Sequence, residues 1–330
     1  MAELRQPSLA IDLVIGSRGP LDGQLRGVGG LVVCDKLQRL FVCDADRMCM
    51  QAFSIVDGSF LFAVNNKAQY IAIDDDETLY CSDHSELLRW LSALTGTVIG
   101  SLPRRESVAP SGIAVLPGVC AFVCYPQVAR VDRLSLADGE RQLPLTAKGL
   151  VRPRYVAVDS ALQRVIVGNS SNWCDERTEH VYVFTINDAG RLLFHFDARG
   201  HVFGLAVDYM SRIIVVGGPD RELRAFTSSG DFISRFTVDD IGCGIDANLR
   251  SVACDKQGRV YVSDYRSQSI YVIGAARWLP FHGWTPDLHR FVPEPLRRQV
   301  LTVTLIRSLE HSLAISLLPN ELLFEIFVYL

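Results

Sequence analysis

Residues 70–83, YIAIDDDETLYCSD, contain the unit that the rest of the sequence repeats. The apolar run YIAI is typical of a strand that is buried on both faces, and it ends at Asp74. Five residues after Asp74, LYCSD predicts a second strand, so the unit is two short strands joined by a turn. The position of Asp74 recurs in six approximate copies, as Asp35, Asp74, Leu116, Asp159, Asp208 and Asp255.

The spacing of the copies predicts a closed ring. Successive reference positions lie 39, 42, 43, 49 and 47 residues apart. A period near forty residues, filled with short strands and turn residues, is typical of a β-propeller with one four-stranded blade per period. Two positions before each reference residue the side chain is small in five of six copies, as crowded inner strands require: Val33, Ala72, Ala114, Ala157, Ala206 and Ala253. The sequence therefore predicts an all-β, six-bladed β-propeller.

The same positions resemble a known repeat family. Gly112 and Gly204 lie four residues before the reference position, and Pro110 and Pro153 lie six residues before it. This order of proline, glycine, alanine and aspartate resembles the NHL repeat over about residues 9–274. The resemblance implies an NHL-type propeller at residues 1–274, which a connector at 275–294 and a short α-helical tail at 295–330 follow.

The first and last strands of the ring are predicted to share one blade. Residues 9–16 form a strand before the first full copy, whereas the sixth copy supplies only three strands, SVACD, RVYVSD and SIYVI. Pairing of these strands removes the open edges of an unclosed array. Deletion of the first sixteen residues is therefore expected to destabilise the whole propeller.

Composition and charge argue against several classes of protein. The 330 residues are 48% hydrophobic and carry a net charge of −4, which is too near neutral for a broad polyanion-binding field. The N-terminal residues lack a signal-peptide pattern, and no apolar run approaches membrane-spanning length. We therefore expect a soluble cytoplasmic protein without a membrane partner, whose nine cysteines are thiols.

The sequence changes character after the last copy. The connector holds four aromatic residues among its prolines, Trp278, Phe281, Trp284 and Phe291, so it is expected to pack along the propeller. A helix is predicted for residues 295–311. A second helix is predicted to open at Pro319, with one apolar face formed by Leu323, Ile326, Phe327 and Leu330.

This last helix resembles the start of an F-box. The matching positions are Leu318, Pro319, Leu322, Leu323, Ile326, Phe327 and Leu330, which cover about thirteen residues. The resemblance implies that Leu318, Pro319, Leu323, Ile326 and Phe327 contact the adaptor of a cullin-type ubiquitin ligase. Packing of the same helix on its own propeller is the alternative.

One end of the predicted ring gathers arginine and aromatic residues. It carries Arg26, Tyr70, Arg152, Arg154, Tyr155, Phe203 and Arg250, and His201 belongs to the same end. Trp173 lies in the longest loop within a repeat, residues 168–180, where it either anchors a partner or folds back onto the blade. We expect a protein client to bind a rim formed by Arg154, Tyr155, Trp173, His201, Phe203 and Arg250.

Two other interpretations of this rim stay open. Some NHL propellers bind single-stranded RNA on such a surface, where arginines contact phosphates and aromatic rings stack on bases. Alternatively, the arginines form ion pairs with nearby carboxylates of Asp44, Asp83, Asp175, Glu176 or Asp264.

A metal site is a further interpretation. The reference aspartates end inner strands, so we expect them to accept hydrogen bonds from turn N–H groups rather than to bind a cation. Asp44, Asp83 and Asp264 end second strands and could face a mouth of the channel, and His84 and His201 lie at the same rim without a third partner. We expect neither a metal nor another cofactor. The segment GVGG, residues 27–30, precedes a strand and is predicted to be a turn, not a dinucleotide loop.

These observations together predict a non-enzymatic protein-interaction scaffold. Its propeller is expected to hold the client, and its tail is expected to link the client to ubiquitin-dependent degradation. An RNA-binding propeller and a metal-dependent hydrolase or lyase are the alternatives.

Overall fold

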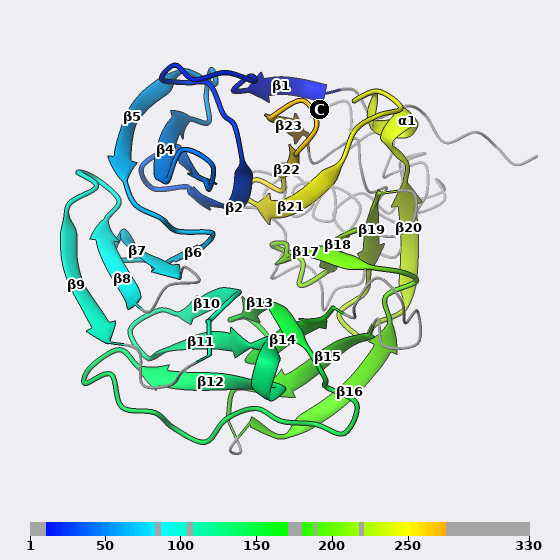
Figure 1. Ribbon diagram of the computed structural model, residues 1–330. Coiled ribbons are helices and arrows are strands. Elements are labelled where there is room, and N and C mark those ends of the chain that lie inside the picture. The colour runs from blue at the N-terminus through cyan, green and yellow to red at the C-terminus, as the bar shows by residue number, and fades with distance from the viewer. Residues whose placement is uncertain are drawn as a thin grey trace, which may run out of the picture.

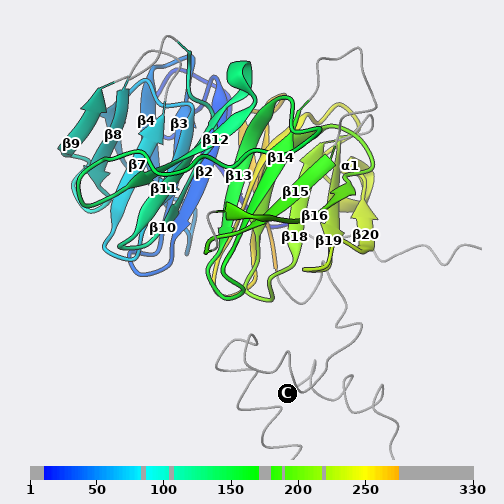
Figure 2. The same ribbon diagram turned by 90° about the horizontal axis from the view of Figure 1, so that it is seen from below.

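Six antiparallel sheets follow one another around a common axis in the computed structural model (Figure 1). The structure describes residues 11–82, 87–103, 108–170, 180–187, 190–217 and 221–274. Seen from the side, the strands run across the thickness of the ring (Figure 2). The predicted six-bladed β-propeller is confirmed.

The blades are numbered here in the order of their inner strands. Blade 1 consists of β2 (Val28–Cys34), β3 (Arg39–Asp44), β4 (Cys49–Ser54) and β5 (Phe60–Asn65). Blade 2 consists of β6 (Tyr70–Ile73), β7 (Thr78–Ser82), β8 (Leu87–Ser92) and β9 (Val98–Pro103). Blade 4 consists of β13 (Pro153–Asp159), β14 (Arg164–Asn169), β15 (His180–Thr185) and β16 (Leu192–Asp197). Blade 5 consists of β17 (Val202–Val207), β18 (Ile213–Gly217), β19 (Glu222–Phe226) and β20 (Phe232–Phe236), and the helix α1 (Val238–Ile241) follows it.

Blade 3, whose reference position is Leu116 in place of aspartate, departs from the predicted four strands per blade. It has three strands, β10 (Ile113–Leu116), β11 (Cys120–Tyr125) and β12 (Arg130–Ser135), with the 3-10 turn η1 (Pro126–Val128) between the last two. In place of a regular outer strand, residues 141–145 touch β12 through two isolated bridges, Leu134 to Arg141 and Val131 to Leu145. Pro144 lies between these bridges and has no N–H to donate to a continuous ladder.

The ring is closed through blade 6. This blade contains β21 (Leu249–Cys254), β22 (Val260–Asp264), β23 (Ser269–Ile273) and the N-terminal strand β1 (Ile11–Ile15). β1 pairs antiparallel with β23, so that Ile11 lies opposite Ile273 and Ile15 opposite Ile270. The predicted closure is therefore confirmed, and the two strands lie side by side at the edge of the ring (Figure 1).

The core consists of apolar layers between neighbouring blades. The layer between blades 6 and 1, for example, joins Ile15, Val33 and Phe53 to Tyr261 and Val272. Corresponding layers fill the other five interfaces. The small inner-strand residues belong to these layers, which explains why their size is restricted.

Four reference aspartates, Asp74, Asp159, Asp208 and Asp255, accept hydrogen bonds within their own turns, as predicted, whereas Asp35 accepts from Lys256 N of blade 6 at 3.1 Å. Asp74 Oδ1 accepts from the N–H groups of Asp76 at 3.0 Å and Thr78 at 2.8 Å. Asp208 and Asp255 make the same pair of bonds two and four residues on, and each also binds an arginine at the fourth position, Arg212 or Arg259, at 2.6 Å. These carboxylates stabilise the hairpins between inner and second strands.

The cysteines of the described residues are all free thiols. Cys34, Cys43, Cys81, Cys124 and Cys254 lie in strands, as predicted. Burial raises the pKa of the Cys43 and Cys124 thiols, so both stay protonated at neutral pH. These cysteines act as small apolar side chains of the core.

Helices contribute little to the described part of the chain, where none has the length and hydropathy of a membrane-spanning segment. The connector and the helical tail predicted for residues 275–330 lie outside the described residues.

Ile15→Ala tests the contribution of ring closure. Ile15 is fully buried between blades 6 and 1, so the substitution is expected to lower the free energy of unfolding by about 2–5 kcal/mol. Val14, its neighbour on β1, is 49% exposed, and Val14→Ala is expected to change that free energy by less than about 0.5 kcal/mol. Urea denaturation followed by circular dichroism measures both. Equally small effects would contradict a structural role for β1.

Candidate functional site

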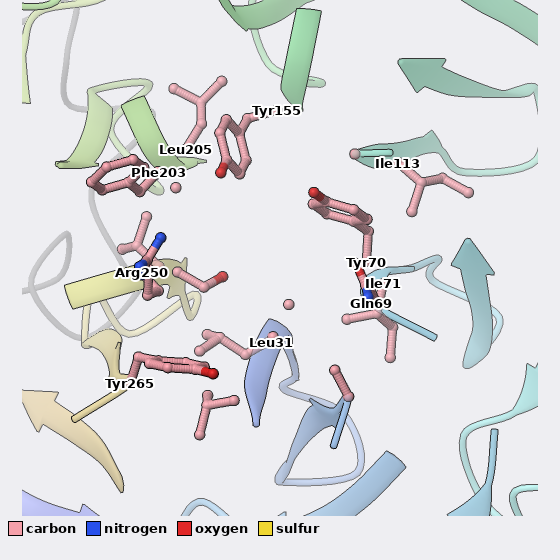
Figure 3. Close-up of a pocket in the computed structure, with 18 of the residues that line it drawn as sticks. Leu31, Gln69, Tyr70, Ile71, Ile113, Tyr155, Phe203, Leu205, Arg250 and Tyr265 are labelled. Carbon is pink, nitrogen blue, oxygen red and sulfur yellow. The ribbon is translucent and has the colours of Figure 1, made fainter. Parts of the chain in front are cut away.

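A cavity of about 490 Å³ opens where the inner strands begin, at one mouth of the central channel. All six blades line it. Figure 3 shows its prominent polar and aromatic side chains arranged around the channel: Tyr70, Tyr155, Phe203, Arg250 and Tyr265. We call these five residues the mouth cluster. The structure thus brings together Tyr155, Phe203 and Arg250 of the predicted rim.

β-Bulges place several of these side chains. The pairing of β13 with β14 shifts between Pro153 and Tyr155, which leaves Arg154 at the irregularity. In the same way, the register shift between β17 and β18 leaves Phe203 at an irregularity of the ladder, and the shift between β21 and β22 does so for Arg250. A bulge inserts a residue into one strand and redirects its side chain, so one backbone device recurs at the mouth in three successive blades.

Glycines let the inner strands meet closely in pairs of blades. A Cβ on Gly30 would lie 3.1 Å from Tyr70 Cα, and a Cβ on Gly112 would lie 3.0 Å from Tyr155 Cα. A Cβ on Gly204 would likewise lie 2.9 Å from Ser251 Cα. Blades 1, 3 and 5 therefore carry glycine where blades 2, 4 and 6 carry a residue with a side chain.

Backbone hydrogen bonds join two of these pairs directly. Gly30 N donates to Gln69 O at 2.8 Å, and Gly112 N donates to Arg154 O at 2.9 Å. These contacts also correct the prediction that GVGG is only a turn. Val28, Gly29 and Gly30 already belong to β2, where a bulge and the close approach of blade 2 require glycine.

Arg250 lies between two aromatic rings. Its guanidinium carbon is 5.0 Å from the ring centroid of Phe203 and 5.5 Å from that of Tyr265, within cation–π distance of both. Its Nε is buried without a hydrogen-bond partner, and no carboxylate of the described chain forms an ion pair with it. Among the described residues, its side-chain contacts are therefore with these two rings.

Two buried side chains hold the flanking segments in place. Gln268 donates to Tyr265 O at 2.6 Å and accepts from Val28 N at 3.0 Å, so it links the Tyr265 turn to blade 1. Arg224 is 1% exposed and donates to the carbonyl oxygens of Ala198 and His201, the latter at 2.6 Å. It thereby supports the segment that leads into Phe203.

The two tyrosines form the opposite side of the cluster. The rings of Tyr70 and Tyr155 meet edge to face with centroids 6.4 Å apart. Burial raises the pKa of both phenols, although the charge of Arg154 opposes the shift and its guanidinium hydrogen-bonds to Tyr155. Both hydroxyl groups therefore stay protonated at neutral pH.

The predicted ion pairs of the rim arginines with Asp44 and Asp264 are wrong for Arg154 and Arg250. Asp44 is fully buried and accepts from Gly27 N at 2.9 Å and from Arg26 N at 3.2 Å. Asp264 accepts from Asn248 N at 2.6 Å and from Arg266 N at 2.8 Å. Backbone donors thus occupy these carboxylates, which also removes them as candidates for a calcium site at a channel mouth. Asp83, Asp175 and Glu176 lie outside the described residues.

His201 lies beside the mouth cluster, stacked on Phe203 with ring centroids 5.7 Å apart and an interplanar angle of 13°. Within the described ranges, no three His, Cys, Asp or Glu side chains are grouped as a metal site would require. The other predicted rim residues, His84 and Trp173, and the tail positions from Leu318 to Phe327 lie outside the described residues.

Tyr265 and Gln268 are the site residues that sequence reasoning missed. Tyr265 directly follows Asp264, the end of a second strand, so its place one residue beyond a repeat position was a usable signal. Tyr70 and Tyr155 stand four residues before their reference positions, where the blade before each carries Leu31 or Gly112. Nothing in the local sequence marks Gln268 as a link between blades.

Comparison with known proteins supports the fold. No family model and no curated protein matches the chain. Among solved structures, hydrazine synthase from Kuenenia stuttgartiensis aligns over 78% of this chain and 81% of its own, with 13% identity and a TM-score of 0.60. U3-55K aligns over 78% of this chain and 79% of its own, with 16% identity and a TM-score of 0.58. The WD40 repeats of RRP9 align over 78% of both chains, with 16% identity and a TM-score of 0.57.

These similarities concern the fold alone, because the identities are so low. WD40 repeats form β-propeller blades, in agreement with the ring described above. The finer resemblances to the NHL repeat and to the F-box stay predictions, since no family model supports them.

Asp44→Ala tests whether this carboxylate is a structural cap. Loss of its bonds to buried N–H groups is expected to lower the free energy of unfolding by about 3 kcal/mol. Asp46→Ala is the matched control, because Asp46 is exposed and close in sequence, and a change within about 0.5 kcal/mol is expected. Both follow from urea denaturation. Added calcium is expected to leave the wild-type midpoint unchanged; a rise that Asp44→Ala abolishes would instead identify a calcium ligand.

Proposed function

We propose that this propeller is a non-enzymatic binding module that holds a protein partner at the mouth cluster. The observation that carries the proposal is Arg250, a guanidinium flanked by Phe203 and Tyr265 with N–H groups that no described residue engages. Arginine and tyrosine are enriched among the residues that dominate the energy of protein interfaces. A rigid ring that presents both at a cavity fits that role.

The ionisation states of the mouth cluster favour binding over acid–base catalysis. A general acid or base works best when its pKa lies near the operating pH. Burial raises the pKa of Tyr70 and of Tyr155, away from neutrality. These phenols are therefore poorly suited to proton transfer at neutral pH.

Single-stranded RNA is the second candidate partner, because arginine and aromatic residues lie together at the mouth. Binding of a phosphate backbone draws on several cations along a groove. Among the residues that line the cavity, Arg250 is the cation and exposed Asp46 opposes it. This balance favours a protein partner over a polyanion.

We propose in addition that the tail links the bound partner to ubiquitin-dependent degradation in the cytoplasm. The support is the resemblance of residues 318–330 to the start of an F-box. In that arrangement, Leu318, Pro319, Leu323, Ile326 and Phe327 contact a cullin-type adaptor while the propeller holds the client.

Cross-linking in cells tests the site of partner binding. Recovery of proteins cross-linked to Arg250→Ala is expected to fall by at least about tenfold relative to wild type, the scale of a dominant interface residue. Lys36→Ala is the control, because it also removes one positive charge but from the turn at the other end of β2, where Lys36 is 69% exposed. Its recovery is expected to match wild type.

Two results would contradict the proposal. Unchanged recovery with Arg250→Ala would place the interface elsewhere. Salt-dependent binding of oligouridylate that Arg250→Ala and Arg154→Ala both weaken would instead favour the RNA-binding alternative. Thermal unfolding of each variant separates lost binding from lost structure.

The double variant Leu318→Ala with Pro319→Ala tests the tail. Affinity purification of the wild-type chain is expected to recover a cullin adaptor, and the double variant is expected to lose it while keeping the client. Recovery of no adaptor with either protein would remove the link to degradation and leave the propeller's partner binding untouched.

A further inference from the structure

Two aromatic rings flank the guanidinium of Arg250 at the cavity. Its carbon lies within cation–π distance of the rings of both Phe203 and Tyr265. The N–H donors of a guanidinium lie in its plane and match the two oxygens of a carboxylate. Arg250 therefore keeps the donors that recognise such a group.

Five backbone donors around the cavity are already engaged within the protein. The N–H groups of Gly27, Val28, Gly30 and Gly112 donate to Asp44, Gln268, Gln69 and Arg154 respectively. Ser251 N donates to the hydroxyl of Ser263. These five N–H groups therefore form no cradle for an anion of the kind that phosphate sites use, and Arg250 is the charged donor that lines the cavity.

The charges at the cavity balance a single negative group. Arg250 and Asp46 line it with opposite charges, and Arg154, which is not a lining residue, adds a positive charge beside Tyr70 and Tyr155. Protonated Tyr70 and Tyr155 add none. The net charge of these groups is thus about one positive unit, which a carboxylate neutralises and a phosphate dianion exceeds.

The walls of the cavity suit an aliphatic stem. Below the mouth cluster the inner strands contribute Leu31, Ile71, Ile113, Val156, Leu205 and Val252. The volume of about 490 Å³ lies within the range of small-ligand pockets and exceeds the needs of one amino-acid side chain. Methylene groups attached to the carboxylate would contact this apolar surface and leave water.

We infer that the mouth cluster is a carboxylate-binding pocket, into which a partner protein inserts the side chain of a glutamate or aspartate. This inference rests on the proposed function and names the chemical group that the site recognises. Phe203 and Tyr265 hold Arg250 in its binding orientation in the free protein, which lowers the entropic cost of binding. A free dicarboxylate would use the same chemistry, and the experiment separates the two sources.

Selection from a random twelve-residue peptide library displayed on phage tests the inference with the full chain. Wild-type protein is expected to enrich peptides that share glutamate or aspartate at one fixed position. For a synthesised winner, Glu→Gln or Asp→Asn at that position is expected to raise the dissociation constant at least about tenfold. Fluorescence anisotropy measures it.

Variants of the protein make the test specific. Arg250→Gln is expected to weaken the winning peptide at least about tenfold and to abolish the difference between its acidic and amide forms. Lys36→Ala is expected to bind like wild type. Tyr265→Ala provides a second variant that folding should tolerate, since Tyr265 is 41% exposed. We expect this variant to bind the acidic peptide more weakly than the wild-type protein does.

The outcomes are distinct. No enrichment of an acidic position, or an acid preference that survives Arg250→Gln, would overturn the inference. Saturable binding of glutarate to the wild type with no peptide enrichment would also overturn it, in favour of a free dicarboxylate ligand. If the library fails but cellular cross-links still depend on Arg250, the proposed function stands and only the carboxylate pocket is wrong.

Discussion

The apolar layer between neighbouring blades is the interaction on which this structure depends. No blade has a core of its own, because each sheet buries its faces against the sheets on either side. In the layer between blades 6 and 1, β1 pairs with β23 and adds Ile15 to the cluster that contains Tyr261 and Val272. An unclosed ring would leave two apolar sheet faces in water, so closure and core formation are one event.

Packing around an axis forces the inner strands together, and the chain meets this constraint in two alternating ways. At three interfaces, a glycine of one blade lies against the backbone of the next, as Gly112 does against Tyr155. At the others, side chains bridge the blades: Ser82 donates to Ser111 O at 2.6 Å, Ser211 to Asp159 at 3.1 Å, and Gln268 accepts from Val28 N. Glycine contacts and side-chain bridges thus alternate around the ring, and Tyr70 and Tyr155 lie at two of the glycine interfaces.

Sequence periodicity predicts the fold well because it records this same constraint. The reference aspartates, the small inner-strand residues and the extra strand before the first copy all report on repeated local geometry. The site is less predictable, because Arg154, Phe203 and Arg250 are positioned by bulges that depend on pairing with a second strand. The expected pairing of Arg250 with Asp264 failed for a related reason: the carboxylate is taken by backbone donors that only the folded turn supplies.

Arg250 departs from the pattern of ion pairs that other arginines of the ring follow. Leu249, its neighbour in sequence, pairs across the sheet with Asp264, yet that carboxylate is committed to the N–H groups of Asn248, Arg266 and Ser267. Aromatic rings replace the missing counter-ion and hold the guanidinium in place without consuming its donors. Elsewhere in the repeats, arginines form ion pairs with the reference aspartates, as Arg212 and Arg259 do. The described residues supply no carboxylate partner for Arg250, and the proposed carboxylate of a partner protein would supply one.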